Sequence, residues 1–319
     1  MINSYKSDMI VGGTSQIVKE GICTIIRLCD ETGEGVMAIY ELFDGVSLAY
    51  NDFHMHLCKT NLEVQSNLLC IDHCREGKIE HEIKEGVYAY TGTGDLKIDN
   101  RRNHKGNMVM PLNHYHGITI CIDIDKANLS LKKVFPAFDI DLNQLKNKFC
   151  INDEPHIISK VESIEHIFHE LYLVPHKIRQ TYMILKIFEL LLFLEALEVK
   201  EDTKERPYFY KTQVEKVKAI HQLMTEHIDK HYTLDELSKK YNISLTVMKN
   251  CFKNIYGDSI FSYMKKYKMN QAAVYLKTHK ELSVCDIAGI LGYDSPGKFS
   301  TAFKSVMGIT PLLYRKNFI

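Results

Sequence analysis

The sequence predicts an α+β protein of several domains, with a β-barrel or β-sandwich at the N-terminus and an all-α domain at the C-terminus. Three observations predict this class. Residues 1–150 contain apolar residues at a period of two, residues 151–199 change to a helical period, and residues 211–319 contain a duplicated pair of short helices. At 319 residues the chain is long enough to form two hydrophobic cores.

The N-terminal part is predicted to be β-rich. From Ile118 to Ile124, isoleucine alternates with threonine, cysteine or aspartate, which is the pattern of a strand with one buried face. The runs Val87–Tyr90 and Leu96–Ile98 flank a glycine-rich segment, so we expect two strands joined by a tight turn. Gly92 and Gly94 in that segment are interpreted as turn residues, because no dinucleotide-binding helix pattern follows them.

The period becomes helical after Pro155. Apolar residues from Ile157 to Leu171 recur at helical spacing, and this predicted helix ends near Pro175. A second predicted helix, residues 177–199, is apolar on nearly all sides and must be covered by core or by a second subunit, two alternatives that stay open. We therefore expect residues 151–199 to form a helical dimerisation segment. The charged stretch 200–210 then follows as an interdomain linker.

The composition favours a cytoplasmic protein. Hydrophobic residues make up 45% of the chain and charged residues 25%, and no basic and apolar leader follows Met1. The most apolar run, Met183–Leu197, is short for a membrane span and contains three charged residues. Nine cysteines without a framework spacing are typical of a reducing compartment rather than of a secreted disulfide scaffold.

The net charge of zero conceals an asymmetry between the two ends of the chain. Residues 211–319 contain 17 lysines and arginines against 9 acidic residues, a net charge of +8 that the rest of the chain balances. A basic C-terminal third attached to an acidic body is the distribution expected of a nucleic-acid-binding domain joined to another domain.

The C-terminal part contains a diverged internal repeat. Leu234 and Leu237 are matched fifty positions later by Val284 and Ile287. After a one-residue insertion, Ser244, Met248, Phe252, Lys253, Gly257 and Ser259 correspond to Ser295, Phe299, Phe303, Lys304, Gly308 and Thr310. Each copy is predicted to be a short helix, a turn and a second helix.

Capping residues predict where the second helices begin. Ser244 and Ser295 can accept hydrogen bonds from the first-turn backbone amides, and Asn242 and Gly292 suit a left-handed turn. The helix expected over residues 260–277 would be about 27 Å long at 1.5 Å per residue. That length can place two recognition helices in successive major grooves, about 34 Å apart.

These segments resemble the AraC/XylS family of bacterial transcription regulators. The resemblance covers about 100 C-terminal residues and rests on residues 232–238, 286–293, 299–304 and 308–315. Residues 295–300 resemble the branch of this family typified by the pyochelin regulator PchR. The acidic N-terminal half is similar in organisation to the family's cupin-like effector domains. The resemblance implies a DNA-binding regulator rather than an enzyme, with contact to RNA polymerase if the protein is an activator. No cofactor is expected, and the apolar helix 177–199 favours a homodimer.

The resemblance places base readout at the start of each second helix. The predicted base-contacting residues are Thr246, Lys249 and Asn250 in the first copy and Ser300 and Thr301 in the second. Lysine can bond guanine and asparagine can bond adenine, whereas Pro296 and Gly297 offer no side-chain donor. The predicted phosphate contacts are Lys253, Ser295, Lys298, Lys304 and Arg315.

The N-terminal part contains candidate ligand-binding residues. His54, His56 and Cys58 would share one face of a strand and are acceptable metal ligands. The same holds for Cys70, His73 and Cys74 and for the alternating pair His114 and His116, but structural or ligand-pocket roles are favoured for all three groups. The residues expected to line an effector pocket are Tyr88, Tyr90, His114, Tyr115 and His116. A siderophore-like or metal-associated effector is compatible with the PchR-like residues.

The sequence therefore predicts a DNA-binding transcription regulator that senses a small molecule through its N-terminal domain. Two alternatives remain: a metal-dependent cupin enzyme with a DNA-binding appendage, and a regulator whose N-terminal half only dimerises. A bound transition metal with an open coordination position would favour the enzyme.

Overall fold

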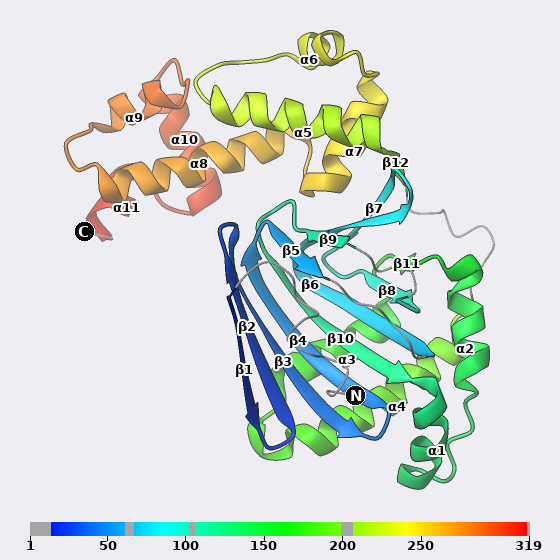
Figure 1. Cartoon of the computed structure of the whole chain (residues 1–319). Helices are drawn as coiled ribbons and strands as arrows, with labels where there is room; N and C mark the ends of the chain where they lie inside the picture. Colours follow the sequence, from blue (N-terminus) through cyan, green and yellow to red (C-terminus); the bar gives the residue numbers. More distant parts are fainter. Residues whose placement is uncertain (1–13, 61–66, 102–105, 199–206, 318–319) are drawn as a thin grey trace. The chain divides into compact units, whose positions relative to one another are not determined.

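The computed structural model describes residues 14–60, 67–101, 106–198 and 207–317. The chain divides into two compact units, Met1–Tyr208 (unit 1) and Phe209–Ile319 (unit 2), which are described separately below (Figure 1). The predicted linker at 200–210 lies outside the described residues up to position 206. Within the described ranges, no helix combines the length and the apolar character needed to cross a membrane.

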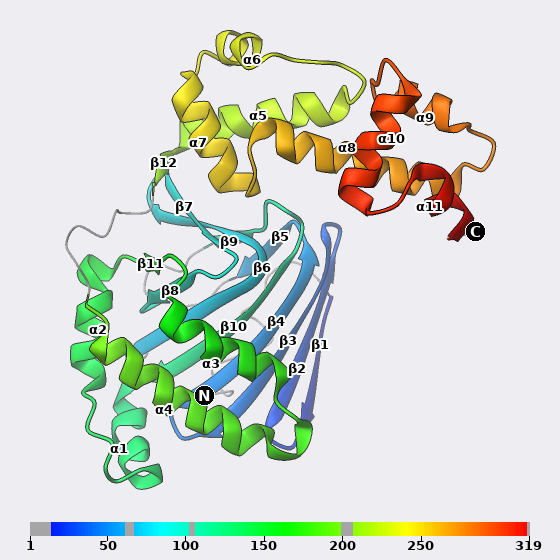
Figure 2. The same cartoon turned by 180° about the vertical axis from the view of Figure 1, so that it is seen from behind.

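Unit 1 is built on one curved antiparallel sheet in which the strands follow the order β1-β2-β3-β4-β10-β6-β7 (Figures 1 and 2). Its strands are β1 (Thr14–Glu20), β2 (Cys23–Asp30), β3 (Gly33–Phe43), β4 (Val46–Met55), β5 (Leu57–Thr60), β6 (Leu68–Lys84), β7 (Val87–Gly92), β8 (Leu96–Asp99), β9 (Gly106–Val109), β10 (Tyr115–Asp123) and β11 (His156–Ile158). The 17-residue β6 pairs with β10 and β8 along its first half and with β7 along its second. The sheet therefore curls into a half-barrel, which confirms the predicted class of the N-terminal domain.

Four helices cover one side of this sheet. They are α1 (Ile124–Val134), α2 (Leu142–Phe149), α3 (Glu162–Leu173) and α4 (Arg179–Ala196). Alternate residues of β4 and β10, such as Leu48 and Ile120, form one core with apolar residues of the helices, such as Phe168 and Leu191. We call this side of the sheet the helix face. On the opposite face, Ala49, Phe53 and Tyr115 belong to a second apolar cluster.

The structure corrects three details of the predicted β-rich region. Strand β10 ends at Asp123, and Ile124 begins α1, because the Asp123 carboxylate accepts a hydrogen bond from the Lys126 amide and caps the helix. Ile157 lies in β11 rather than in a helix. Strands β7 and β8 flank the predicted turn but pair with different parts of β6 and do not form a hairpin with each other.

The helical part of unit 1 begins earlier than predicted. It starts at Ile124 rather than after residue 150, and its helices share a core with the sheet, so residues 14–198 belong to one unit. The predicted helix 177–199 corresponds to α4, which ends at Ala196. A short 3-10 turn, His176–Ile178, directly precedes it. Leu190, Leu191 and Leu194 on α4 are fully buried within the unit, whereas Leu185 and Leu192 are exposed.

Unit 2 opens with the short β12 (Phe209–Tyr210) and is otherwise helical. Its helices are α5 (Lys211–Glu226), α6 (Leu234–Tyr241), α7 (Leu245–Tyr256), α8 (Ile260–Thr278), α9 (Val284–Ile290), α10 (Pro296–Met307) and α11 (Pro311–Asn317). The predicted helix 260–277 is α8, which at 19 residues is about 28 Å long. Helices α6 and α7 form the first helix-turn-helix, and α9 and α10 form the second.

Candidate functional site

The two turns of unit 2 have the predicted backbone conformation. Asn242 adopts the left-handed region with φ 46°, and Gly292 does so with φ 73°. A Cβ atom on Gly292 would lie 2.1 Å from the carbonyl oxygen of Asp229, so this position excludes every side chain. The hydroxyls of Ser244 and Ser295 accept hydrogen bonds from the backbone amides three residues later, which starts α7 and α10 where the sequence predicts.

The second helix of each motif is anchored by two large side chains four residues apart. Met248 and Phe252 on α7 and Phe299 and Phe303 on α10 are all fully buried. Residues four apart lie on one face of a helix, so the side of α7 and α10 that points away from the core is available to a ligand.

The exposed side of α7 carries the predicted base-reading residues. Thr246, Lys249 and Asn250 are all exposed. The hydrogen bond from the Asn254 side chain is accepted by the Asn250 backbone carbonyl and does not use the exposed side-chain amide of Asn250. This side chain can therefore donate and accept at a base edge, as bidentate recognition of adenine requires.

The corresponding side of α10 is chemically poorer. Pro296 and Gly297 are exposed but contribute no polar side-chain atom. Ser300 is half-buried, and the Thr301 hydroxyl donates to the Gly297 carbonyl at 3.0 Å. A hydroxyl that is bonded to its own helix has less capacity to bond a base, so α10 offers little for direct readout.

Four of the five predicted phosphate contacts lie at positions that suit this role, and the fifth does not. Lys253, Lys298 and Lys304 are exposed, and Ser295 caps the N-terminus of α10. The Arg315 guanidinium instead donates to the Leu282 carbonyl at 2.8 Å and is partly buried. Arg315 therefore connects α11 to the loop before α9. This role depends on a tertiary contact, which the position of Arg315 in the sequence did not indicate.

Two further residues brace the second motif, and the sequence did not single them out. Lys268 on α8 is buried and its ammonium donates to the Leu291 carbonyl at 2.9 Å, where α9 ends. Burial lowers the pKa of this lysine. His231, in the segment before α6, contacts the Gly292 carbonyl at 2.7 Å. For the contact between Lys268 and Leu291, the one signal in the sequence was a lysine among the apolar residues of α8.

The predicted effector-pocket residues of unit 1 do not share one face of the sheet. Tyr115 is buried in the opposite-face cluster beside Phe53, whereas His116, the next residue of β10, lies on the helix face. Consecutive residues of a strand point to opposite sides, so these two cannot line one pocket. Tyr90 is buried and donates to Glu80 at 2.7 Å, its neighbour Tyr88 is half-buried, and His114 contacts the Leu112 carbonyl.

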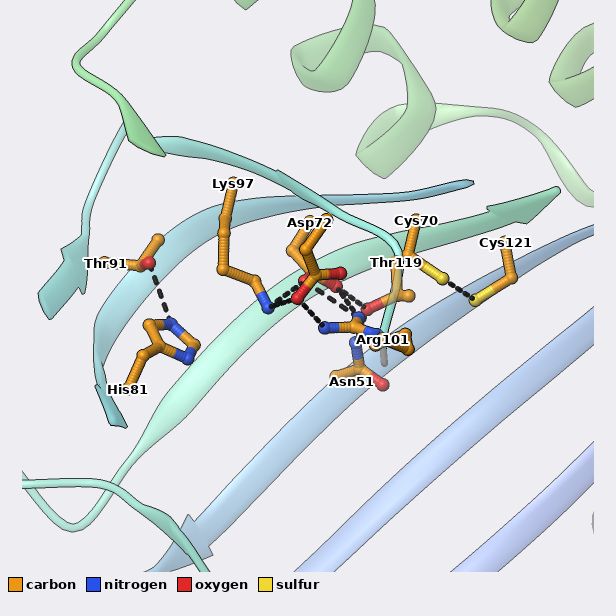
Figure 3. Close-up of polar contacts among 10 residues, drawn as sticks. Asn51, Cys70, Asp72, His81, Thr91, Lys97, Arg101, Thr119 and Cys121 are labelled. Carbon is orange, nitrogen blue, oxygen red and sulfur yellow. Dashed lines mark hydrogen bonds and ion pairs between the residues drawn. The ribbon is translucent and has the colours of Figure 1, made fainter. Parts of the chain in front are cut away.

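The opposite face instead carries a buried polar cluster (Figure 3). Asp72 accepts two hydrogen bonds from Arg101, at 2.7 and 2.8 Å, and lies 3.0 Å from the Lys97 ammonium. Burial alone would raise the pKa of Asp72, but the Arg101 and Lys97 charges outweigh it and hold this pKa well below its usual range. With Asp99 beside both cations, two positive charges face two negative charges.

Some polar atoms on this face have no hydrogen-bond partner among the described residues. The amide nitrogen of Asn51 donates to Thr119 at 2.9 Å, but its Oδ1 atom is buried without a partner. The Thr24 hydroxyl, also buried on this face, is in the same situation. Buried polar groups are normally satisfied, so these two atoms are candidate contacts for a ligand.

The residues first considered as metal ligands are also separated. His54 and His56 are exposed, and His56 contacts Asn113 at 3.1 Å, but Cys58 is buried in the apolar cluster of the opposite face. Burial raises the pKa of the Cys58 thiol to about 11, which disfavours the thiolate that binds metals. In the second group, His73 lies on the helix face, stacked on Phe168, whereas the following residue Cys74 belongs to the opposite face.

These features define a two-unit protein with a complete double helix-turn-helix module. Residues 237–317 match a family of helix-turn-helix domains. The chain is 24% identical over 128 residues to the HTH-type transcriptional activator RhaR of Mannheimia succiniciproducens. The aligned region covers 40% of this chain and 46% of RhaR. The chain is also 33% identical over 90 residues to the regulatory protein SoxS of Escherichia coli (strain K12). This aligned region covers 28% of this chain and 83% of SoxS.

The solved C-terminal domain of AraT, a response regulator from Geobacillus stearothermophilus, is also similar. It is 32% identical, with a TM-score of 0.31, over 32% of this chain and 84% of that domain. The matched part spans about half of RhaR but most of SoxS. The chain belongs to the AraC/XylS family of DNA-binding transcription regulators, as the sequence predicted.

Proposed function

We propose that this protein regulates transcription in the cytoplasm by binding a duplex operator through α7 and α10 of one chain. The observation that carries the proposal is the exposed, polar start of α7 on a scaffold that is duplicated at α10. Because the two recognition helices differ and are covalently joined, each chain is expected to bind an asymmetric site.

The direct test is to sequence the genomic fragments that the protein retains in cells. A shared, asymmetric motif spanning two successive major grooves is the expected result. Retained fragments without a common motif would contradict sequence-specific binding. Transcription from a promoter carrying this motif then distinguishes activation, which requires contact with RNA polymerase, from repression.

We further propose that unit 1 binds a small effector on the face of the sheet opposite α3 and α4. The apolar cluster around Phe53 and the unpartnered Asn51 Oδ1 and Thr24 hydroxyl together resemble a ligand site, which is mostly apolar with a few fixed polar groups. The nearby ion pairs neutralise each other, so the site favours an uncharged ligand region that donates a hydrogen bond to Asn51.

A thermal-shift screen that includes siderophore-like and other metal-chelating compounds would identify the effector. An effector that controls DNA binding must bind with different affinity in the presence of operator, and operator affinity must change by the same factor. Asn51→Ala should weaken effector binding, whereas His169→Ala, at an exposed position of α3, should leave it unchanged. Equal effector affinity with and without operator would refute control of DNA binding by this ligand.

Dimerisation through α4 is the third part of the proposal. Leu185 and Leu192 on α4, and Ile178 in the 3-10 turn directly before it, are spaced seven residues apart and remain 60%, 53% and 49% exposed within one chain. Residues seven apart lie on one side of a helix and supply one of the two apolar positions of the heptad by which helices pair. Leu185→Asp combined with Leu192→Asp should convert a dimer to a folded monomer in sedimentation. Leu191→Asp would instead unfold unit 1, because Leu191 is fully buried in it.

A further inference from the structure

Two histidines and an aspartate meet on the helix face of unit 1, beyond the apolar core. Asp52 and His54 are two residues apart on β4 and therefore point to the same side of the sheet. His116 on β10 lies directly opposite Asp52 in the antiparallel register. All three are accessible to solvent, with side-chain exposures of 58% for Asp52, 57% for His54 and 29% for His116.

The three side chains direct one atom each to a common point. The Nε2 atoms of His54 and His116 are 3.3 Å apart, and each lies 3.0 Å from the same oxygen, Oδ1 of Asp52. Ligands that bind Zn²⁺ tetrahedrally at 2.0–2.1 Å are separated from one another by about 3.3 Å. The spacing of the three atoms is therefore close to that of three ligands around one ion.

The nearby acidic residue occupies the position of a supporting group. Oε2 of Glu76 on β6 lies 3.8 Å from Nδ1 of His116, the ring nitrogen that is not directed to the common point. Metal-binding histidines commonly direct their second nitrogen to a carboxylate, which fixes the ring orientation and makes the other nitrogen a better ligand. At 3.8 Å the contact is longer than a hydrogen bond, so Glu76 would take this supporting role after a small movement of its side chain.

We propose that Asp52, His54 and His116 form a binding site for Zn²⁺ or a chemically similar divalent transition metal ion. Two imidazoles and one carboxylate are ligands that such ions accept, and water would occupy the fourth, solvent-facing position. A bound ion would connect β4 to β10 in the middle of the sheet and stabilise unit 1. This inference does not depend on the proposed regulation of transcription.

The test is a titration of the full-length protein with Co²⁺, whose visible absorption reports tetrahedral coordination, followed by competition with Zn²⁺. Exposed thiols also bind these ions, so the parent protein should carry Cys29→Ser and Cys285→Ser, which remove the two exposed cysteines. One Co²⁺ per chain, displaced by Zn²⁺, is the expected result. Zn²⁺ should also raise the melting temperature of the parent.

Single substitutions then identify the ligands. His54→Ala, His116→Ala and Asp52→Asn should each weaken Co²⁺ binding by about 100-fold, and Glu76→Gln by about 10-fold. His56→Ala is the matched control, because His56 is equally close in sequence and exposed but contacts Asn113 instead. The proposal is overturned if the parent binds no Co²⁺ at one equivalent. It is also overturned if the three ligand variants bind as tightly as the parent, or if His56→Ala loses as much affinity as they do.

Discussion

The two helix-turn-helix motifs of unit 2 use the same internal contacts but expose different chemistry. Both have a serine cap, a left-handed turn residue and a buried pair of side chains four residues apart. On the exposed side, α7 presents Lys249 and Asn250, whereas α10 presents Gly297 and a threonine bonded to its own helix. Folding requires the internal residues of both copies, but it places no such demand on the exposed ones. We therefore expect base readout to be concentrated in the first motif.

The largest expected difference between the motifs is in the cost of changing the turn. Gly292→Ala should destabilise unit 2 by about 3 kcal/mol or more, because the left-handed backbone and the clash with Asp229 both oppose a Cβ atom. Asn242→Ala should cost only about 1 kcal/mol, since Asn242 already accommodates a Cβ atom there. Urea unfolding of residues 207–319, which contain the compact unit Phe209–Ile319, measures both.

Gly289→Ala provides the control for this comparison. Gly289 lies within α9, and beyond the backbone of that helix no atom of the described residues lies within 4 Å of the point that a Cβ atom would occupy. Alanine should therefore stabilise the helix by up to about 1 kcal/mol. Similar losses for Gly292→Ala and Asn242→Ala would show that the close approach of Asp229 to the second turn has no energetic consequence.

The next largest effect concerns operator affinity. Lys249→Ala and Asn250→Ala should each cost about 1–3 kcal/mol on the operator and much less on a scrambled duplex, because a lost base contact affects only the cognate sequence. Ser300→Ala and Thr301→Ala should each cost less than about 0.5 kcal/mol. Fluorescence anisotropy with both duplexes measures the four variants. If Lys249→Ala weakens both duplexes equally, Lys249 contacts phosphate rather than a base.

Features that depend on nearby residues were predictable from the sequence. The caps at Ser244 and Ser295, the left-handed turns and the buried pairs each involve residues no more than four positions apart, and all were confirmed. The end of β10 was missed because Ile124 continues the alternating pattern into the first turn of α1, where it is buried as well. Periodicity alone cannot separate these cases.

Features that depend on distant pairing were not predictable. Asp52 was not a candidate ligand, because its neighbour His116 becomes adjacent only through the register of β4 and β10. The contacts of Arg315 with Leu282, and of His231 with Gly292, likewise join segments far apart in sequence. The grouping of Tyr115 with His116 was a different error, since strand alternation already places them on opposite faces.

A smaller effect is expected on the stability of the first motif at low pH, because a histidine is buried in its core. His221 on α5 stacks on Tyr256 of α7, with ring centroids 4.3 Å apart, and contacts the Tyr263 hydroxyl at 2.9 Å. Burial lowers the pKa of His221 from 6.5 to about 4. The unfolded chain therefore binds a proton below pH 6.5 that the folded chain does not, so stability is complete above pH 6.5 and is lost as the pH falls towards 4.

At pH 5 this loss should amount to about 1 kcal/mol after solvent screening is included. Urea unfolding of residues 207–319 at pH 7 and pH 5 measures it, and His221→Gln should remove most of the difference. His227→Gln, at an exposed histidine, should leave the pH dependence unchanged. An unchanged pH dependence in His221→Gln would assign the effect to other groups.

A loss of DNA affinity smaller than this change in stability tests whether the second motif contacts phosphate. Lys298 lies in the first turn of α10, where the backbone amides and the helix dipole favour an anion. Its ammonium is 3.8 Å from Asp294, but both side chains are more than 70% exposed, so this pair contributes little and leaves Lys298 available to DNA. Lys298→Ala should weaken operator and scrambled duplex alike, by roughly threefold, and should reduce the slope of log affinity against log salt by about 0.9. An operator-specific loss would mean that α10 reads bases through Lys298, and the contrast between the two motifs would then be one of residue choice rather than of function.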